Sequence, residues 1–348
     1  MREEVQRSGP SVLRLALAAL VLAGMMGGVP ALAGESVTRT VVPVGRAVGV
    51  KLFSDGVMVV GFSQVPAARG ESIPAKECGL REGDVITHIN AAEVDTIEDV
   101  QAQLAQIGGE TMSIRALREG EQIQLTAQAV KCSTDGSYKL GAWLRDSMAG
   151  IGTVTYYDPA TGAFGALGHG INDVDTAQLM PLESGGVLKA TVSDVKKGKR
   201  GEPGELHGEL EMKKDIGALE RNTCYGIFGT LTEGALTDAR PVEVASREEL
   251  RTGPAFIYAN VQGDEVKRYE VEITKLFPKA EDGRDMMVKV TDPALIAATG
   301  GIVQGMSGSP ILQDGRIVGA VTHVLIGDSA QGYGISMENM LRAGETDI

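Results

Sequence analysis

The sequence contains few cysteines, few aromatic residues and little positive charge, and each shortage excludes a class of protein. Cysteine occurs three times in 348 residues, at Cys78, Cys132 and Cys224. An odd, widely spaced set indicates neither a disulfide framework nor a zinc-binding cysteine motif. The formal net charge is −13. Nucleic acid is therefore not expected as a partner, because binding the phosphate backbone requires a basic surface.

Aromatic residues make up only 4% of the chain, whereas 46 residues are glycine. Many glycines without long helical periodicity indicate short strands joined by turns, so we expect a mainly β fold. Apolar residues account for 43% and charged residues for 23%, a balance typical of folded proteins rather than disordered ones. A chain of 348 residues is long enough for two domains behind an N-terminal leader.

Long apolar stretches are also missing, except at the N-terminus. There, three arginines within the first 14 residues precede the uncharged run Leu15–Val29, which is followed by Ala31-Leu32-Ala33. A basic start, a short apolar run and an Ala-x-Ala site are typical of an export signal. We therefore expect residues 1–33 to be a signal peptide that is cleaved after Ala33, or to remain as a membrane anchor.

Residues 37–131 carry the pattern of a small peptide-binding domain. The run Val57-Met58-Val59-Val60-Gly61-Phe62 is followed by Cys78-Gly79-Leu80-Arg81-Glu82-Gly83-Asp84-Val85-Ile86 and then by Ile89-Asn90. This order resembles the Gly-Leu-x-x-Gly-Asp-x-Ile…Ile-Asn run of bacterial PDZ domains. The resemblance implies an α+β domain that holds an extended peptide by adding it to a strand edge.

The helix of this domain is predicted over Ile97–Ile107. Thr96 is a suitable N-cap with Asp99 three residues later, and two glycines end the helix. Strands are predicted at Thr111–Leu117 and Gln122–Ala129. A bound peptide is expected along the first strand and the helix, at Val59, Val60, Gly61, Phe62, Val100 and Leu104. The alternative is a small α+β domain without a ligand. The sequence contains no Gly-Leu-Gly-Phe, so the loop that would bind the peptide carboxylate stays open.

The most specific motif in the chain is Gly305-Met306-Ser307-Gly308-Ser309-Pro310. A nucleophilic serine requires a tight turn that exposes its hydroxyl and directs two backbone N–H groups at the developing oxyanion. Ser307 is therefore the candidate nucleophile, and the N–H groups of Gly305 and Ser307 are the candidate oxyanion hole. The run resembles the Gly-Asp-Ser-Gly-Gly-Pro of trypsin-like peptidases, with Met306 in place of the aspartate. The alternative is a turn without chemistry.

The residues after this motif agree with a trypsin-like second barrel. Asp314-Gly315 is a hairpin turn signal, and Ile317–Leu325 alternates as a strand does. A nucleophile turn followed by a hairpin is the order found there. We therefore predict a trypsin-like double β-barrel peptidase domain behind the PDZ domain.

His169 is the candidate general base. It stands between two glycines after an apolar strand, where an exposed position at a strand end is expected. His323, on the strand after the nucleophile, is the alternative base. His88 belongs to the PDZ core pattern and His207 to a charged stretch. No two histidines have the spacing of metal ligands, so neither a metal nor another cofactor is expected.

A histidine base also needs a group that fixes its tautomer and stabilises the imidazolium. Asp292 is the first candidate, because it follows the alternating run Met287–Thr291 and precedes a proline. Asp173 and Asp175 compete with it, since both follow His169 closely. An aspartate four residues after a histidine is, however, more often a turn residue.

Together these features resemble the SpoIVB peptidases, the S55 family of endospore-forming bacteria. The resemblance extends over the leader, the PDZ domain, Leu140–Ser147 with Ala149–Gly152, and the motifs around His169 and Ser307. It implies a peptidase domain at residues 138–345 and a triad in the order His169, Asp292, Ser307.

The resemblance also implies a biological role. Members of the family are exported across the forespore membrane into the space between the two sporulation membranes. There they cleave themselves and the membrane-anchored regulatory partner of an intramembrane metalloprotease, which then matures a late mother-cell sigma factor. Spacing alone indicates only an exported serine peptidase. The alternatives are an envelope quality-control protease of the HtrA type, in which the PDZ domains follow the protease, and a non-catalytic PDZ scaffold.

Overall fold

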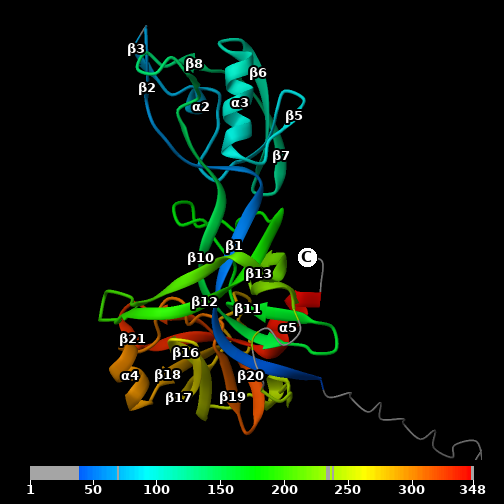
Figure 1. Cartoon of the computed structure of the whole chain (residues 1–348), viewed down its shortest axis with the longest axis vertical. Helices are drawn as coiled ribbons and strands as arrows, with labels where there is room; N and C mark the ends of the chain where they lie inside the picture. Colours follow the sequence, from blue (N-terminus) through cyan, green and yellow to red (C-terminus); the bar gives the residue numbers. More distant parts are fainter. Residues whose placement is uncertain (1–38, 69, 233–235, 237–238, 346–348) are drawn as a thin grey trace, which may run out of the picture. The chain divides into compact units, whose positions relative to one another are not determined.

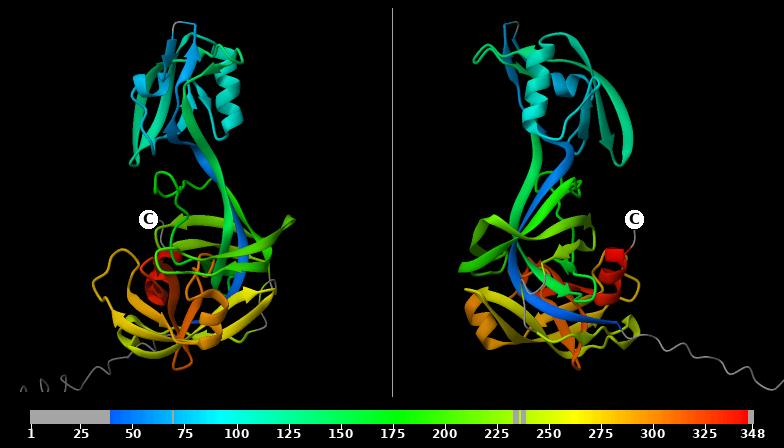
Figure 2. Two further views of the ribbon diagram at one scale, coloured as in Figure 1. Left: turned by 90° about the vertical axis from the view of Figure 1, so that its left-hand side faces the viewer. Right: turned by 45° about the vertical axis from the view of Figure 1, so that its right-hand side comes forward.

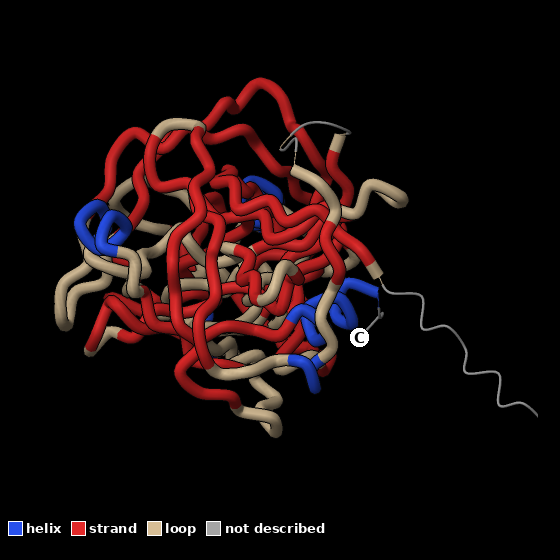
Figure 3. Tube along the Cα trace, turned by 90° about the horizontal axis from the view of Figure 1, so that it is seen from below, coloured by secondary structure: helices blue, strands red, loops and turns tan. Residues whose placement is uncertain are grey.

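The computed structural model describes residues 39–68, 70–232, 236 and 239–345, so the predicted export signal lies outside the described residues. The chain divides into two units after Thr38, and all that follows concerns the second unit. Strands make up most of this unit, and the helices are few and short (Figure 3). No helix of the described segments is both long and apolar enough to cross a membrane.

Six strands close a first barrel. They follow one another as β1, β12, β13, β14, β11 and β10, and the pairing of β10 with β1 completes the ring. The bounds of these strands are Thr40–Phe62 for β1, Ala142–Tyr157 for β10, Ala163–Ala166 for β11, Ser184–Lys196 for β12, Glu205–Thr223 for β13 and Gly226–Leu231 for β14. Their inward side chains, including Leu52, Phe164 and Ile227, form one hydrophobic core.

Six further strands close a second barrel in the order β16, β17, β18, β21, β20, β19. Their bounds are Gly253–Gln262, Glu265–Leu276, Met286–Val290, Asp328–Ser336, Arg316–Leu325 and Pro310–Gln313. Helix α4 (Pro293–Thr299) lies between β18 and the nucleophile motif, and α5 (Met337–Glu345) ends the described chain. The predicted hairpin is confirmed, because Asp314 and Gly315 adopt φ values of 51° and 79° between β19 and β20.

A smaller α+β region stands between β1 and β10 in the sequence. It contains α2 (Pro74–Glu77), β4 (Val85–Ile89), β5 (Ala92–Glu93), α3 (Ile97–Ile107), β6 (Thr111–Arg118) and β7 (Glu121–Gln128). The predicted helix is confirmed in detail, since Thr96 and Asp99 form a reciprocal capping box and Gly108 follows the last residue. The short strands β2 and β3 (Val65–Ala67, Gly70–Ser72) and β8 and β9 (Val130–Lys131, Tyr138–Lys139) form two small ribbons.

Strands β1 and β10 are long enough to belong to both the first barrel and the α+β region (Figures 1 and 2). They pair from Val42↔Tyr157 to Phe62↔Ala142, with a break in register between Phe53 and Met58. Strand β1 therefore leads from the barrel into the α+β region, and β10 leads back. The predicted fold class, mainly β with a PDZ-type α+β region and a double barrel, is confirmed. The α+β region does not precede the double barrel, however, because β1 already belongs to the first barrel and the region is inserted between β1 and β10.

Candidate active site

A cleft of about 540 Å³ is lined by residues of both barrels. His169 reaches it from the loop after β11, and Ser307 and His323 reach it from the second barrel. The structure thus brings together three residues that stand far apart in the sequence. The remaining walls are mostly apolar and include Val50, Ile151, Leu167, Ile171, Ile302, Val303 and Val324.

The nucleophile turn depends on glycine at two positions. Gly305 and Gly308 have φ values of 94° and 98°, a region that other residues rarely adopt. A Cβ atom at position 308 would also collide with the carbonyl oxygen of Thr153. Met306, between them, is fully buried in the core of the second barrel. An apolar residue therefore suits this position.

Three backbone N–H groups of this turn have hydrogen-bond partners. The N–H of Met306 donates to Val303 O (3.1 Å), that of Gly308 to Val321 O (2.7 Å) and that of Ser309 to Met306 O (3.0 Å). In the described part of the chain, the N–H groups of Gly305 and Ser307 have no such partner. These are the two donors predicted for an oxyanion hole, and both remain available for a ligand.

Ser307 itself is half-buried, and its hydroxyl donates to the carbonyl oxygen of Thr322 at 2.8 Å. No hydrogen bond joins Ser307 to His169 within the described ranges. The hydroxyl must therefore leave Thr322 before it can give its proton to an imidazole. Catalytic hydrogen bonds are often formed only once a substrate is bound, so the arrangement is compatible with a nucleophilic role.

Two consecutive residues with positive φ, Leu167 (68°) and Gly168 (69°), turn the chain at the end of β11 and place His169 in the cleft. The ring Nδ1 lies 2.8 Å from the carbonyl oxygen of Gly170. Since a carbonyl only accepts, Nδ1 carries the proton and Nε2 keeps a free lone pair. Burial lowers the pKa of His169, although the Gly170 carbonyl partly opposes this shift. The imidazole is therefore neutral and suited to accept a proton.

His323 is the second imidazole in the cleft, with its ring centroid 5.0 Å from that of His169. Desolvation in the cleft, followed by the nearby His169, lowers the pKa of His323 to about 4. Among the residues that the structure describes, no hydrogen bond holds either of its ring nitrogens.

Asp292 lies directly after β18, and its carboxylate serves as the N-cap of α4. One carboxylate oxygen accepts from the N–H groups of Ala294 (2.8 Å) and Leu295 (3.1 Å), and the other from that of Glu270 (3.2 Å). Asp292 does not line the cleft. The structure therefore does not bring it to His169, contrary to the expected orienting role. The sequence signal, a carboxylate followed by proline, is equally the signal of a helix start.

The competing aspartates have structural contacts as well. Asp173 is 1% exposed, accepts from the N–H groups of Asp175 and Thr176, and forms an ion pair with Arg145 of β10. Asp175 pairs with the same guanidinium at 2.8 Å. Both aspartates thus lie in the turn after His169, with Arg145 as their partner. Instead of a carboxylate, the group that fixes the tautomer of His169 here is the carbonyl of Gly170.

Comparison with known proteins identifies the catalytic region. The family model described as SpoIVB peptidase S55 matches residues 136–341, and a PDZ domain model matches residues 71–118. The chain belongs to the SpoIVB peptidase S55 family. It is therefore a serine peptidase that also contains a PDZ domain.

Other matches to this S55 peptidase are shorter or more distant. A zinc metalloprotease, RasP of Shouchella clausii (strain KSM-K16), is 41% identical over 68 residues, which are 20% of this chain and only 16% of that protein. The Rv3671c protease from M. tuberculosis in its active form is 14% identical, with 72% of this chain and 86% of that chain covered and a TM-score of 0.32. The PDZ domain of an SdrC-like protein from Listeria monocytogenes is 21% identical, with 26% and 87% covered and a TM-score of 0.21.

The strand expected to bind a peptide in the PDZ domain of this S55 peptidase already has partners. Residues 58–62 of β1 pair along one edge with β10, for example Val59↔Leu144 and Phe62↔Ala142, and residues 57–58 pair with β4. The edge that faces β10 is therefore not free for a peptide along Val59, Val60, Gly61 and Phe62. On the helix, Val100 (1% exposed) and Leu104 (6%) are buried in the domain core.

An unpaired strand edge exists elsewhere in the same sheet. Within the described residues, β10 pairs only with β1 from Ala142 to Gly152. Asp146 of this strand accepts a hydrogen bond from the first N–H of α3, at Ile97 (2.9 Å), so the unpaired stretch lies beside the helix. The sequence showed the Leu140–Ser147 motif but not that it completes the sheet, because strand pairing is set by distant residues.

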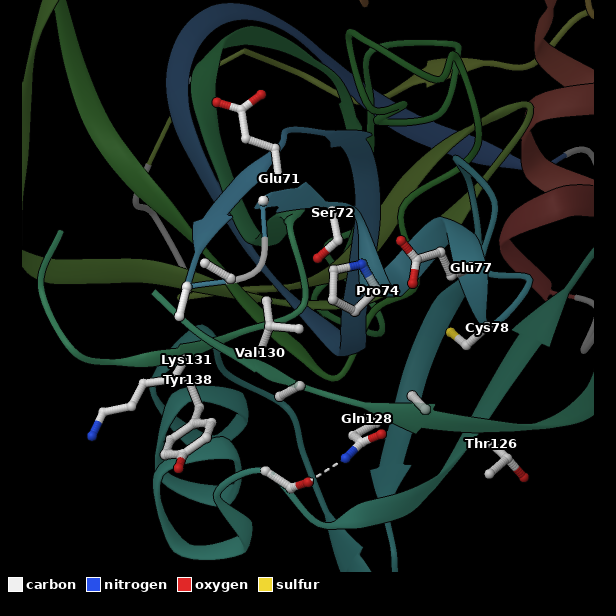
Figure 4. A pocket seen from close by; sticks show the side chains of 16 residues that line it. Glu71, Ser72, Pro74, Glu77, Cys78, Thr126, Gln128, Val130, Lys131 and Tyr138 are labelled. Carbon is white, nitrogen blue, oxygen red and sulfur yellow. Dashed lines mark hydrogen bonds between the residues drawn. The ribbon is translucent and has the colours of Figure 1, made fainter. Parts of the chain in front are cut away.

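The PDZ domain also has a hollow of about 590 Å³ beside α2 and β7 (Figure 4). Glu71, Glu77, Lys131 and Tyr138 are among its lining residues, and Gln128 Nε2 donates to Gly109 O at 2.6 Å. Neither Ser307 nor the two histidines of the cleft line this hollow. In the described segments, no three His, Cys, Asp or Glu side chains are grouped as metal ligands would be.

Proposed function

We propose that this peptidase cuts its substrates by nucleophilic attack of Ser307, with His169 as general base. The observation that carries the proposal is the turn at Gly305–Pro310. Its backbone leaves two N–H groups unpaired beside a serine that shares a cleft with a neutral, anchored imidazole. These are the groups that an acyl-transfer site requires.

The reaction follows from these groups. Ser307 Oγ leaves Thr322 O, gives its proton to Nε2 of His169 and bonds to the carbonyl carbon of the scissile peptide. The negative charge that develops on the carbonyl oxygen is stabilised by the N–H groups of Gly305 and Ser307. His169 then protonates the leaving amine, and water hydrolyses the acyl-enzyme by the same steps. Throughout, the Gly170 carbonyl accepts from Nδ1–H and keeps the ring oriented.

The biological substrate proposed is the regulatory partner of an intramembrane metalloprotease. Membership of the SpoIVB family supports this substrate. The same membership supports two further proposals: self-cleavage near the N-terminus, and a role in the activation of a late mother-cell sigma factor. The location proposed is the space between the two sporulation membranes, reached through the N-terminal export signal. The mainly apolar cleft supports an extended substrate with apolar side chains near the cut bond.

For the PDZ domain we propose peptide binding at the free edge of β10 rather than at β1. An incoming strand can pair with the unpaired backbone there, next to α3. Ala142 and Leu144 of this segment pack against the domain core, while Trp143, which is 63% exposed, stands out into solvent. An exposed tryptophan beside an open strand edge is a suitable anchor for a peptide side chain.

The test is to incubate wild-type and Ser307→Ala proteins alone, and with the ectodomain of a candidate membrane regulator, and to determine the N-termini of the fragments. We expect a few defined cuts from the wild type and none from Ser307→Ala. A folded Ser307→Ala protein that still produces the same fragments would refute the nucleophile assignment. Broad degradation of unfolded casein by the wild type, without cleavage of the regulator, would favour a quality-control protease instead.

A further inference from the structure

Thr153 of β10 lies directly beneath the nucleophile turn and is 1% exposed. Its N–H donates to the carbonyl oxygen of Ser307 (3.1 Å), and its hydroxyl donates to that of Gly305 (2.7 Å). Its own carbonyl oxygen accepts from the N–H of Leu167 (3.1 Å), two residues before His169. One buried residue of the first barrel therefore bonds both the nucleophile turn and the loop of the base.

The hydroxyl of Thr153 fixes a peptide unit that matters for the oxyanion hole. The peptide between Gly305 and Met306 is held at both ends, because its carbonyl accepts from Thr153 Oγ1 and its N–H donates to Val303 O (3.1 Å). The preceding peptide is held by its carbonyl, at Gln304, which accepts from Leu206 N of β13 (2.9 Å). Since the carbonyl and N–H of a trans peptide point in opposite directions, the N–H of Gly305 points away from β13.

Gly305 by itself does not maintain this orientation. Glycine populates positive and negative φ about equally, so its neighbouring peptides can rotate at little steric cost. Without the Thr153 hydroxyl, the carbonyl of Gly305 would be a buried acceptor without a donor, and the peptide would turn toward another partner. This peptide joins the two peptides that carry the N–H groups of Gly305 and Ser307, so its rotation would change the orientation of these two donors relative to each other.

We propose that Thr153 is a positioning residue whose hydroxyl holds the oxyanion hole in its working orientation. This inference rests on the proposed function of Ser307 and His169. Because the negative charge develops only after attack, the hydroxyl stabilises the transition state and not the bound substrate. Its loss should lower kcat and leave KM nearly unchanged.

The experiment compares three variants with the wild type. Thr153→Val removes the hydroxyl at nearly the same volume, and Thr153→Ser keeps it. The matched control is Thr155→Val: Thr155 is two residues further along β10, is fully buried, and its hydroxyl has no hydrogen-bond partner among the described residues. Steady-state kinetics are measured on a peptide that spans a cut site found with the wild type. Binding is measured with a peptide aldehyde of the same sequence, which forms an oxyanion on addition of Ser307.

For Thr153→Val we expect kcat to fall about 100-fold, the scale of losing one oxyanion donor, with KM within about twofold. Affinity for the aldehyde should fall in parallel, while affinity for the C-terminal product peptide, which places no oxygen in the oxyanion hole, should not change. Thr153→Ser should keep kcat within about threefold of the wild type, and Thr155→Val should behave as the wild type does.

An unchanged kcat in folded Thr153→Val would overturn the proposal. So would an equal loss in Thr155→Val, because the effect would then come from core packing. If Thr153→Val does not fold, Thr153→Ala provides the same comparison, with the same fall in kcat expected and an unchanged kcat again contradicting it. A wild type without Ser307-dependent peptidase activity would instead show that the proposed function itself has failed.

Discussion

The two imidazoles in the cleft differ in how their ring nitrogens are held. His169 Nδ1 donates to the Gly170 carbonyl, which fixes the tautomer that a base requires, whereas His323 has no hydrogen-bond partner among the described residues. An imidazole without a fixed tautomer is a poor base for a defined geometry. His169 is therefore the stronger candidate for accepting the proton of Ser307.

This difference predicts unequal effects of matched substitutions. His169→Gln should lower kcat for a short peptide by about 10⁴-fold or more, because the nucleophile and its base act as a unit. His323→Gln should lower it by less than about tenfold. Single-turnover rates on one peptide, with folding checked by circular dichroism, make the comparison. The reverse order of effects would identify His323 as the base.

The protonation state of His169 should determine how the activity depends on pH. A histidine base works when unprotonated, and burial lowers the pKa of His169 from the ordinary value of about 6.5. We therefore expect kcat/KM to rise with pH, with a midpoint below about 6.5, and to be level around neutrality. A midpoint well above 6.5 in a plot of kcat/KM against pH would contradict this environment.

The free energy of unfolding should also increase as the pH rises. Below pH about 6.5 the unfolded chain protonates its histidines, while His169 in the folded protein stays neutral to lower pH. The unfolded state then binds more protons, so the free energy of unfolding decreases as the pH falls through this window.

Substitutions at Asp292 distinguish a structural role as the N-cap of α4 from a role as the acid that orients His169. Its carboxylate accepts three backbone hydrogen bonds at the start of α4, and asparagine is an equally good N-cap. Asp292→Asn should thus keep activity close to wild type and retain the cap of α4, although its NH2 group cannot accept from the N–H of Glu270 and some stability is lost. Asp292→Ala should lose about 1 kcal/mol of unfolding free energy, measured by urea denaturation. A loss of about 10⁴-fold in kcat for a folded Asp292→Asn protein would instead restore Asp292 as the orienting acid.

At the scale of elements, the sequence was sufficient to predict those helices and hairpins whose structure depends only on neighbouring residues. Helix α3 was predictable from Thr96, Asp99 and the following glycines, and the β19–β20 hairpin from Asp314-Gly315. The edge of the PDZ sheet was not predictable, because the partner of Val59 is Leu144, 85 positions later. The same holds for Thr153, whose hydroxyl meets Gly305 only after both barrels have closed.

The buried face of α3 leads to an element-scale prediction. Leu104 is 6% exposed in the PDZ core, so Leu104→Glu would place a carboxylate among apolar side chains. We expect a loss of about 3 kcal/mol or more in unfolding free energy. Thermal melting measures this loss. Gln106→Glu, on the exposed face of the same helix, should melt like the wild type. An unaltered melting temperature for Leu104→Glu would show that this helix face is accessible after all.

At the scale of the whole molecule, the site depends on both barrels. The proposed base comes from a loop of the first, the turn of the proposed nucleophile from the second, and Thr153 bonds the two. Strands β1 and β10 extend from the first barrel into the PDZ domain, and Arg145 of β10 pairs with Asp173 in the loop that follows His169. The proposed capture of a protein substrate thus lies on the sheet that β1 and β10 share with the PDZ domain, whereas the proposed cleavage takes place between that sheet and the second barrel.

This separation predicts that substrate capture can be impaired while the chemistry stays intact. Trp143→Ala removes the exposed side chain beside the free edge of β10, without touching the cleft. Cleavage of the membrane-regulator ectodomain should slow about tenfold or more, whereas kcat/KM for a short peptide should stay within about twofold. Ile296→Ala, which removes an exposed apolar side chain from α4, is the matched control and should change neither rate. Fragment formation followed by gel densitometry at equal enzyme concentration measures the first rate, and a fluorogenic peptide the second. Equal losses in both assays from folded Trp143→Ala protein would mean that β10 serves the active site itself, and unchanged rates in both would place the peptide elsewhere than on β10.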